Sequence, residues 1–312
     1  IVVKAHDIAY CEYSVPDLDK METFLTDFGM EKVERTADRL YMRGAGPHPY
    51  IHVSHKGEPG FVACAMSATS AADLETIAGH KDATSGVEDI DGPGGGKRVS
   101  LRAPGGFRID LVHGIARAEE LPVRDPLQVN FAKIKNRAGV MQRPAIEPSR
   151  VVRIGHCVFK VPNEIEFRQW LMDTVGMLPS DHLQAPDNED MTIGSFLRMD
   201  RGDQWTDHHS VLCLESPDEV KIHHTSYETQ DPDAVFIGHE WLRERGWQHE
   251  WGVGRHLLGS QVFDYWRDPW GHMFEHYADG DLLKSDALPG KYSAVQENLA
   301  QWGPELSPTF FD

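Results

Sequence analysis

The fold of this chain is decided by a stretch that occurs twice. One copy reads Cys157-Val158-Phe159-Lys160-Val161-Pro162-Asn163-Glu164 and continues after a short gap as Trp170-Leu171-Met172-Asp173-Thr174-Val175-Gly176-Met177. The other copy reads Cys11-Glu12-Tyr13-Ser14-Val15-Pro16-Asp17-Leu18 and continues as Phe24-Leu25-Thr26-Asp27-Phe28-Gly29-Met30. The two prolines, Pro16 and Pro162, are 146 residues apart. This repeat indicates that one structural unit is used twice along the chain.

Each copy begins as a strand and then changes to a helical pattern. β-Branched and aromatic residues favour the strand, and Asp17 and Asn163 are suitable N-caps for the helix that follows. Gly29 and Gly176 stand where a helix would end, because glycine readily adopts the left-handed conformation found there. The sequence therefore predicts two copies of one α+β domain.

Further patterns extend each copy. Residues 61–67 lead into 71–79, and residues 222–229 lead into 233–245, as strand–helix pairs. The turn and strand Ala103-Pro104-Gly105-Gly106-Phe107-Arg108-Ile109-Asp110 also match Asp268-Pro269-Trp270-Gly271-His272-Met273-Phe274-Glu275. We therefore predict two strand–helix–strands modules in each domain. The predicted limits are 1–145, 146–285 and a tail, 286–312, packed on the surface, with a weakly periodic linker at about 116–150.

Composition excludes several classes of partner. The 312 residues include 31 Lys and Arg against 49 Asp and Glu, a formal net charge of −18. A chain this acidic lacks the basic face that nucleic acid or an anionic membrane requires. No apolar run is long enough to span a bilayer, and the N-terminus has no signal-peptide pattern. We expect a cytoplasmic protein that forms a homo-oligomer, with its four distant cysteines buried as free thiols.

Histidines are concentrated in the second copy, where 11 of the 17 lie between residues 151 and 280. His156, His224 and Glu275 fall on three predicted strands whose inward side chains can converge. Two imidazoles and one carboxylate on one face are the facial triad of non-haem Fe(II) oxygenases. Alone, a strand histidine is more often a hydrogen-bonded core residue than a metal ligand. Alternation along the strand would also send the adjacent His223 to the opposite face. Because Tyr10 occupies the place of His156 in the first copy, we expect that copy to be free of metal.

One run of residues indicates a function far more specifically than these single histidines do. It reads Gly254-Arg255-His256-Leu257-Leu258-Gly259-Ser260-Gln261-Val262-Phe263-Asp264-Tyr265-Trp266-Arg267-Asp268-Pro269-Trp270-Gly271-His272-Met273-Phe274-Glu275. This run resembles the signature of type I extradiol ring-cleaving dioxygenases of the vicinal oxygen chelate superfamily: Gly-x-His, a strand with a Tyr, an Asp-Pro-x-Gly turn and a Glu. The departure is Asp264, where an apolar residue is usual. The resemblance covers about residues 1–285, including a silent N-terminal copy and an active C-terminal one.

The resemblance implies a fold, a reaction and residue roles. Each domain would consist of two βαβββ modules, as in the glyoxalase-like fold. The reaction would be extradiol (meta) cleavage of a substituted catechol or trihydroxybenzene with O₂ at a non-haem Fe(II) site, in the degradation of aromatic compounds. His156, His224 and Glu275 would be the metal ligands, and Mn(II) suits the same ligands. The remaining implied roles are acid/base catalysis by His209, with His208 as the alternative, and hydrogen bonding to substrate oxygens by His256 and Tyr265.

The sequence gives weaker evidence for the residues that line the substrate pocket. Val158 lies two residues beyond His156 and would face the same side, and Trp251 and Leu258 could add to an apolar wall. Leu257, Phe196 and Met172 are further candidates, and any of these side chains could equally be plain core. An apolar wall would favour an alkyl- or aryl-substituted catechol.

Two other functions remain open at this stage. One is another metal-dependent enzyme of the superfamily, a glyoxalase-like isomerase or a thiol transferase. The other is a non-enzymatic small-molecule binding protein, which would need an apolar pocket but no metal ligands. We find no flavin, nicotinamide or haem motif in the sequence. The glycine-rich run Gly92-Pro93-Gly94-Gly95-Gly96 opens no clear helix, so we predict a loop there and no phosphate-binding turn.

Overall fold

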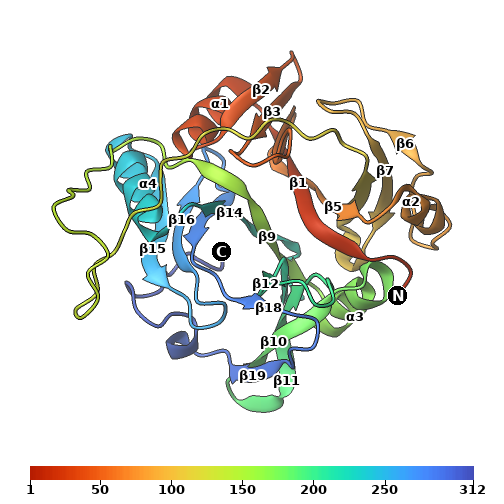
Figure 1. Ribbon diagram of the computed structural model, residues 1–312. Coiled ribbons are helices and arrows are strands. Elements are labelled where there is room, and N and C mark those ends of the chain that lie inside the picture. The colour runs from red at the N-terminus through yellow and green to blue at the C-terminus, as the bar shows by residue number, and fades with distance from the viewer.

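The computed structural model describes residues 1–312 and divides most of the strands between two large sheets (Figure 1). The N-terminal half comprises β1 (Ala5–Val15), α1 (Leu18–Asp27), β2 (Glu31–Arg35), β3 (Arg39–Arg43), β4 (His52–Lys56), β5 (Gly60–Ala68), α2 (Ala71–Ala78), β6 (Glu88–Asp89), β7 (Lys97–Arg102), η1 (Pro104–Gly106) and β8 (Arg108–His113). The order of elements, one strand, one helix and three strands, occurs twice in this half. The predicted βαβββ modules are confirmed in this half.

The C-terminal half repeats the same order and adds short elements. It comprises β9 (Val151–Val161), α3 (Glu164–Val175), β10 (Leu178–Ala185), β11 (Asn188–Arg198), β12 (Thr206–Asp207), β13 (Val211–Glu215), β14 (Lys221–Thr229), α4 (Pro232–Glu244), β15 (Gln248–Arg255), β16 (Val262–Arg267), β17 (Met273–Ala278), β18 (Leu282–Leu283), β19 (Gly290–Ser293) and η2 (Gln296–Asn298). The predicted α+β class with tandem copies is therefore confirmed.

Within each sheet the first strands of the two modules are neighbours. The order is β2-β3-β4-β1-β5-β8-β7-β6 in one sheet and β15-β16-β17-β14-β9-β13-β11-β10-β19 in the other. β1 pairs antiparallel with β5, and β9 pairs antiparallel with β14. This pairing brings side chains from both modules to the middle of one sheet face.

The residues that we expected to begin and end the helices do so in the structure. The Asp17 carboxylate accepts hydrogen bonds from the first backbone N–H groups of α1, and the Asn163 side chain caps α3 in the same way. α3 ends at Gly176, whose φ of +72° lies in the left-handed region. Capping residues satisfy backbone N–H groups that no helical carbonyl can reach, so they fix where each helix begins.

The two halves share one hydrophobic core. A cluster of 45 buried residues extends from β1 and α1 into β9, α3 and β17. Cys11 and Cys157, which match in the repeat, meet at its centre with their sulfur atoms 3.2 Å apart. All four cysteines are free and buried, as expected. Burying one side chain such as the fully enclosed Phe28 contributes about 1.5–3 kcal/mol, so the shared core holds the halves together.

The linker has no regular secondary structure, whereas part of the tail joins the C-terminal sheet. Residues 116–150 form no helix or strand and pass from the N-terminal half across to α4, where Arg124 pairs with Asp231 at 2.5 Å (Figure 1). The tail is more than the surface segment that we expected. β19 extends the C-terminal sheet beside β10, and Phe310 is 6% exposed. The side chains near the end of the tail therefore pack into the C-terminal half.

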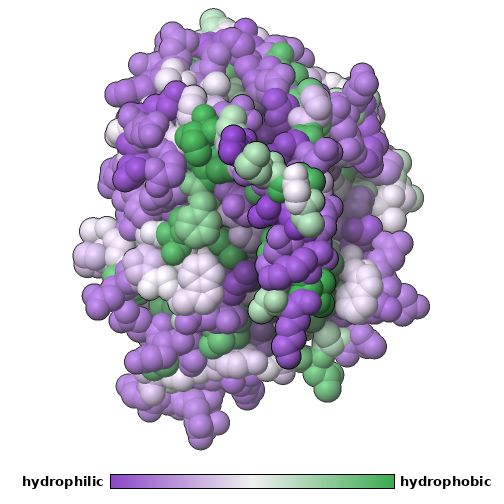
Figure 2. All heavy atoms as spheres, turned by 60° about the vertical axis from the view of Figure 1, so that its left-hand side comes forward, coloured by the Kyte–Doolittle hydropathy of each residue, from purple (hydrophilic) through white to green (hydrophobic).

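The surface view in Figure 2 is largely hydrophilic, in keeping with the acidic composition. No helix of the protein is both long enough and apolar enough to cross a bilayer. The domain limits, the homo-oligomer and the cytoplasmic location stay predictions.

Candidate metal centre

The three predicted ligands come together on neighbouring strands. β9 carries His156, β14 carries His224 and β17 carries Glu275, and Ser226 on β14 stands opposite both His156 and Glu275 in the strand register. His156 Nε2 lies 3.0 Å and His224 Nε2 lies 3.3 Å from Glu275 Oε2. All three side chains are buried. Ser226, which the sequence did not single out, donates a hydrogen bond of 2.5 Å to the same carboxylate oxygen.

The cluster fits a divalent cation. His224 Nε2 and Glu275 Oε1 are buried without a hydrogen-bond partner, which is costly unless another group satisfies them. Burial would raise the pKa of Glu275, but the three imidazoles that surround its carboxylate, those of His156, His224 and His256, hold that pKa well below its usual range. The carboxylate is therefore ionised and acceptor-only. Two imidazole nitrogens and one such carboxylate form a donor set that suits Fe(II) or Mn(II).

An adjacent histidine orients His224. His223 Nε2 lies 2.7 Å from the carbonyl oxygen of Phe310, so this nitrogen carries a proton and donates it. His223 Nδ1 is then the acceptor for His224 Nδ1–H at 2.7 Å, which leaves the lone pair of His224 Nε2 free to face Glu275. We expected His223 and His224 to face opposite sides, and this is wrong. A register irregularity between Ile222 and His224 interrupts the alternation, and both rings line the same cavity.

The pair His208 and His209 follows the same pattern just beyond β12. His208 Nε2 lies 2.7 Å from the Asp181 carboxylate and therefore donates to it, and its Nδ1 lies 3.0 Å from His209 Nδ1. The His209 ring stands 4.2 Å from that of His156 and lines the cavity, whereas His208 turns toward Asp181. Burial lowers the pKa of His209 well below its usual value, and the neighbouring His156 and His208 act in the same direction. A neutral His209 with a free Nε2 can accept a proton.

His256 and Tyr265 stand on the other side of the cluster. The Leu299 carbonyl accepts a hydrogen bond of 2.8 Å from His256 Nδ1–H, so His256 Nε2 accepts from the Tyr265 hydroxyl at 2.8 Å. Burial, with the Glu275 charge beside it, raises the pKa of Tyr265 well above its usual value. The phenol therefore keeps its proton and can act as a hydrogen-bond donor.

These groups surround one cavity of about 90 Å³. The predicted Val158, Trp251 and Leu258 line it, as does Phe196, and Leu257 packs against its wall. Its other apolar lining residues, which were not predicted as its wall, are Leu183, Leu212, Leu214, Leu299, Phe310 and Phe311. Neither Lys nor Arg is among the lining residues. The cavity is thus apolar apart from its histidines, Tyr265 and two amide side chains.

One expectation about this wall is wrong. Met172 lies on α3 and packs against the main core, so it does not line the cavity. The aromatic residues of the tail differ in their positions. Phe310 and Phe311 line the cavity, whereas Trp302 packs beside Arg255. Gln261 was missed: it is 2% exposed, and its side-chain oxygen has no hydrogen-bond partner.

The matching place in the N-terminal half has different residues. The strand register puts Tyr10 at the position of His156, Ala63 at that of His224 and Asp110 at that of Glu275. Tyr10 packs on Tyr50, with ring centroids 4.9 Å apart. Asp110 is held by both Nε and Nη2 of Arg108, at 2.9 and 2.7 Å.

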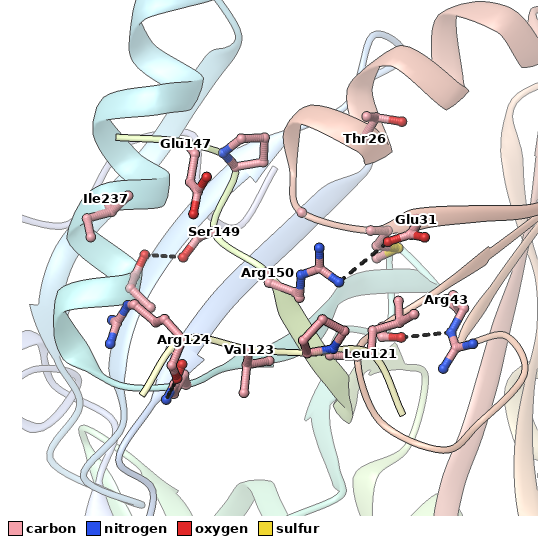
Figure 3. Close-up of a pocket in the computed structure, with 18 of the residues that line it drawn as sticks. Thr26, Glu31, Arg43, Leu121, Val123, Arg124, Glu147, Ser149, Arg150 and Ile237 are labelled. Atoms are coloured by element: carbon pink, nitrogen blue, oxygen red, sulfur yellow. Dashed lines mark hydrogen bonds and ion pairs between the residues drawn. The ribbon is translucent and has the colours of Figure 1, made fainter. Parts of the chain in front are cut away.

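A larger cavity of about 380 Å³ lies between the halves, away from these residues (Figure 3). Arg124 and Arg150 at its wall are paired with Asp231 and Glu31. Arg43 donates to the backbone carbonyls of Gly44, Gly46 and Glu119. Its cationic groups are thus already engaged within the protein.

Two curated relatives align with nearly the whole chain. Metapyrocatechase 2 of Cupriavidus necator is 28% identical, over 98% of this chain and 91% of the relative. A manganese-dependent 2,3-dihydroxybiphenyl 1,2-dioxygenase of Geobacillus genomosp. 3 is 24% identical, over 94% and 92%. No protein-family model matches the chain.

Solved structures share the fold over the same extent. The Mn(II)-bound glyoxalase from Novosphingobium aromaticivorans has a TM-score of 0.80 and 22% identity, covering 99% of this chain and 98% of that one. Homoprotocatechuate 2,3-dioxygenase from Brevibacterium fuscum, in complex with 3,4-dihydroxyphenylacetate, has a TM-score of 0.80 and 17% identity, covering 100% and 93%. The resemblance to the type I extradiol dioxygenases is thus confirmed, and the chain has the fold of the vicinal oxygen chelate superfamily.

Proposed function

We propose that this protein is an extradiol dioxygenase that cleaves an uncharged, substituted catechol with O₂ at a non-haem Fe(II) site. His156, His224 and Glu275 would hold the metal, and the small apolar cavity would hold the ring. Both curated relatives carry names of ring-cleaving enzymes, one of them manganese-dependent. Fe(II) is proposed over Mn(II) from the resemblance, and both metals suit this donor set.

The observation that carries the proposal is the placement of three further side chains around the ligands. His209 stands on one side of the cluster, and His256 and Tyr265 stand on the other, all lining the same cavity. An isomerase or a thiol transferase needs no such set, and a binding protein needs no cluster of unsatisfied metal ligands. The set does match a reaction in which a diol must be positioned and a proton moved.

Each group has a defined task in this reaction. When bound, the metal would supply Lewis acidity to both diol oxygens and bring the ring and O₂ within contact distance. Tyr265 O–H and His256 Nε2 would orient the diol by hydrogen bonds. His209 Nε2 would take up a proton from the substrate and return it later, as general acid–base catalysts do.

The cavity wall defines the class of substrate. Leu183, Phe196 and Leu258 form one apolar cluster beside the ligands, and Trp251, Tyr265 and Phe310 form another. Because no Lys or Arg lines the cavity, a carboxylate on the ring would be buried without a counter-charge, which is unfavourable. We therefore propose an alkyl- or aryl-substituted catechol or trihydroxybenzene over an acidic one.

The test begins with protein purified without air. Its metal content is determined, and a panel of catechols is added with O₂ while oxygen uptake and the formation of a yellow ring-opened product are followed. The panel should pair each apolar substituent with a carboxylated analogue of similar size. Iron, stoichiometric oxygen uptake and a preference for the uncharged member of each pair are the expected results.

Other outcomes point elsewhere. Iron without oxygen uptake on any catechol would favour the isomerase or transferase alternative. Failure to bind Fe(II) or Mn(II) under any reconstitution would favour a binding protein. A preference for the carboxylated catechols would overturn the proposed substrate class while leaving the reaction in place.

A further inference from the structure

A second cluster of metal-ligating side chains lies on the outer face of the C-terminal sheet. It is built around Asp264, the residue that replaces the usual apolar residue before Tyr265. Since adjacent strand residues point to opposite faces, Tyr265 faces the cavity and Asp264 faces α4. The Asp264 side chain is completely buried, and none of its hydrogen-bond or ion-pair partners is Lys or Arg.

Two histidines and a tryptophan contact the Asp264 carboxylate. His239 Nδ1, from α4, lies 3.1 Å from Oδ2, and His249 Nε2, from β15, lies 2.8 Å from Oδ1. Trp266 Nε1–H donates to Oδ2 at 2.6 Å. Burying an ionised carboxylate is costly without compensation, so a position that would ordinarily be apolar needs strong partners. The tryptophan alone supplies a single neutral hydrogen bond.

The separations match those of ligands around one ion. Metal bonds of about 2.1 Å place neighbouring ligand atoms about 3.0–3.4 Å apart. The nitrogen–oxygen separations of 2.8 and 3.1 Å are close to this range, and all three ligand atoms lie within 4.8 Å of one another. At the proposed catalytic centre the corresponding separations are 3.0 and 3.3 Å. The same donor set therefore occurs on both faces of the sheet.

The outer cluster is also accessible. The side chains of His239 and His249 are 21% and 31% exposed, so an ion can reach their nitrogens without passing through the core. Gly252 lies over the carboxylate, and a Cβ there would stand 2.6 Å from Asp264 Oδ1. Glycine at this position thus avoids the close contact that a Cβ would make with the carboxylate.

We propose that His239, His249 and Asp264 bind one divalent cation of the zinc class, separate from the proposed catalytic metal. Two imidazoles with one carboxylate favour Zn²⁺, Ni²⁺ or Cu²⁺ over Mg²⁺ or Ca²⁺, which prefer all-oxygen sites. The ion would tie α4 to β15 and β16 directly behind the strand that carries Tyr265, with water in the open positions. Trp266 would fix the carboxylate, as groups around metal ligands commonly do.

The experiment uses the iron-loaded protein and Zn²⁺ as the probe. Zinc binding is followed by calorimetry, and bound zinc and iron are counted in the same samples for the wild type, His239→Ala and His249→Ala. His80→Ala is the matched control, because His80 lies 3.7 Å from Asp82 but has no second histidine beside it. We expect one zinc per wild-type chain with iron retained, the same in the control, and loss of that zinc in both other variants.

Crystals soaked in equimolar Zn²⁺ and measured at the zinc absorption edge provide an independent readout. An anomalous peak bounded by His239, His249 and Asp264 supports the proposal. Zinc that persists in His249→Ala, or a peak found only beside Glu275, overturns it. Absence of zinc binding by the wild-type iron-loaded protein would also overturn it and leave a cluster that is only hydrogen-bonded. None of these outcomes depends on whether the protein cleaves catechols.

Discussion

The two halves of the molecule have the same strand order but opposite chemistry at one matching place. The C-terminal half has His156, His224 and Glu275 there, with unsatisfied atoms turned toward one point. The N-terminal half has Tyr10 and Ala63 in place of the histidines. The same strand order therefore carries different side chains at this place, and in our proposal these few side chains decide whether a cation can bind.

The contrast extends to how each half satisfies a buried carboxylate. Asp110, at the position of Glu275, is paired with Arg108 in the same strand. Glu275 has no Arg or Lys partner and is surrounded by histidines. A guanidinium neutralises its partner permanently, whereas imidazoles leave lone pairs for a cation. This difference separates a structural ion pair from a ligand set.

The largest expected effect comes from breaking the C-terminal set. His156→Ala should abolish iron binding and lower turnover more than about a thousandfold, because even one transition-state hydrogen-bond donor is worth about 10²–10³. Iron content and oxygen uptake are the measurements. Tyr10→Phe, at the matching position, should keep both. Stoichiometric iron in His156→Ala would remove this residue from the ligand set.

The second prediction distinguishes the catalytic step from the binding of iron and catechol. His209→Asn should retain iron and bind catechol anaerobically, but turn over about 10²–10⁴-fold more slowly, the usual contribution of an acid–base group. Single-turnover kinetics would measure it. His208→Asn should have a smaller effect, because His208 acts on the cavity only through His209. The reverse order of the two variants would exchange their roles.

A third prediction concerns the orientation of His224. His223→Ala removes the acceptor for His224 Nδ1–H, and groups of this kind are typically worth about 10–100-fold in metal affinity. Competition with a chelator would give the metal dissociation constant. His223→Gln, which keeps a polar side chain, should lose less. Equal affinity in His223→Ala and the wild type would contradict the assigned tautomer.

Tyr265→Phe is expected to act on the substrate rather than on the metal. It leaves His256 Nε2 without its donor, and an unsatisfied buried group costs about 1–3 kcal/mol, equivalent to about 5–150-fold in kcat/KM. Iron content should be unchanged. Tyr50→Phe in the N-terminal half serves as the control and should leave kcat/KM at the wild-type value. Loss of iron in Tyr265→Phe would indicate a structural role instead.

The smallest effect on activity is expected in the N-terminal half. Asp110→Asn breaks the pair with Arg108, and breaking a buried pair costs about 3–5 kcal/mol. The Arg108 side chain is 32% exposed and can be solvated, so we expect about 1–2 kcal/mol, measured by urea unfolding, with kcat unchanged. A fall in kcat at full metal content would show that the two halves are coupled.

The repeat, the helix limits at Asp17 and Gly176 and the candidate ligands could all be predicted from the amino-acid sequence. These features are local or recur at a fixed spacing, and capping and strand patterns depend on nearby residues. The signature ending at Glu275 added the reaction, because its spacing is specific.

The contacts between distant segments became known only from the folded chain. Strand register made Asp110 the counterpart of Glu275, and a local irregularity turned His223 and His224 into the same cavity. The tail contributes a carbonyl at Phe310 to His223, although it lies 87 residues further along the chain. Asp264 looked like a departure from a pattern until α4 and β15 brought two histidines to it. Such contacts arise from long-range packing, which neither composition nor local periodicity encodes.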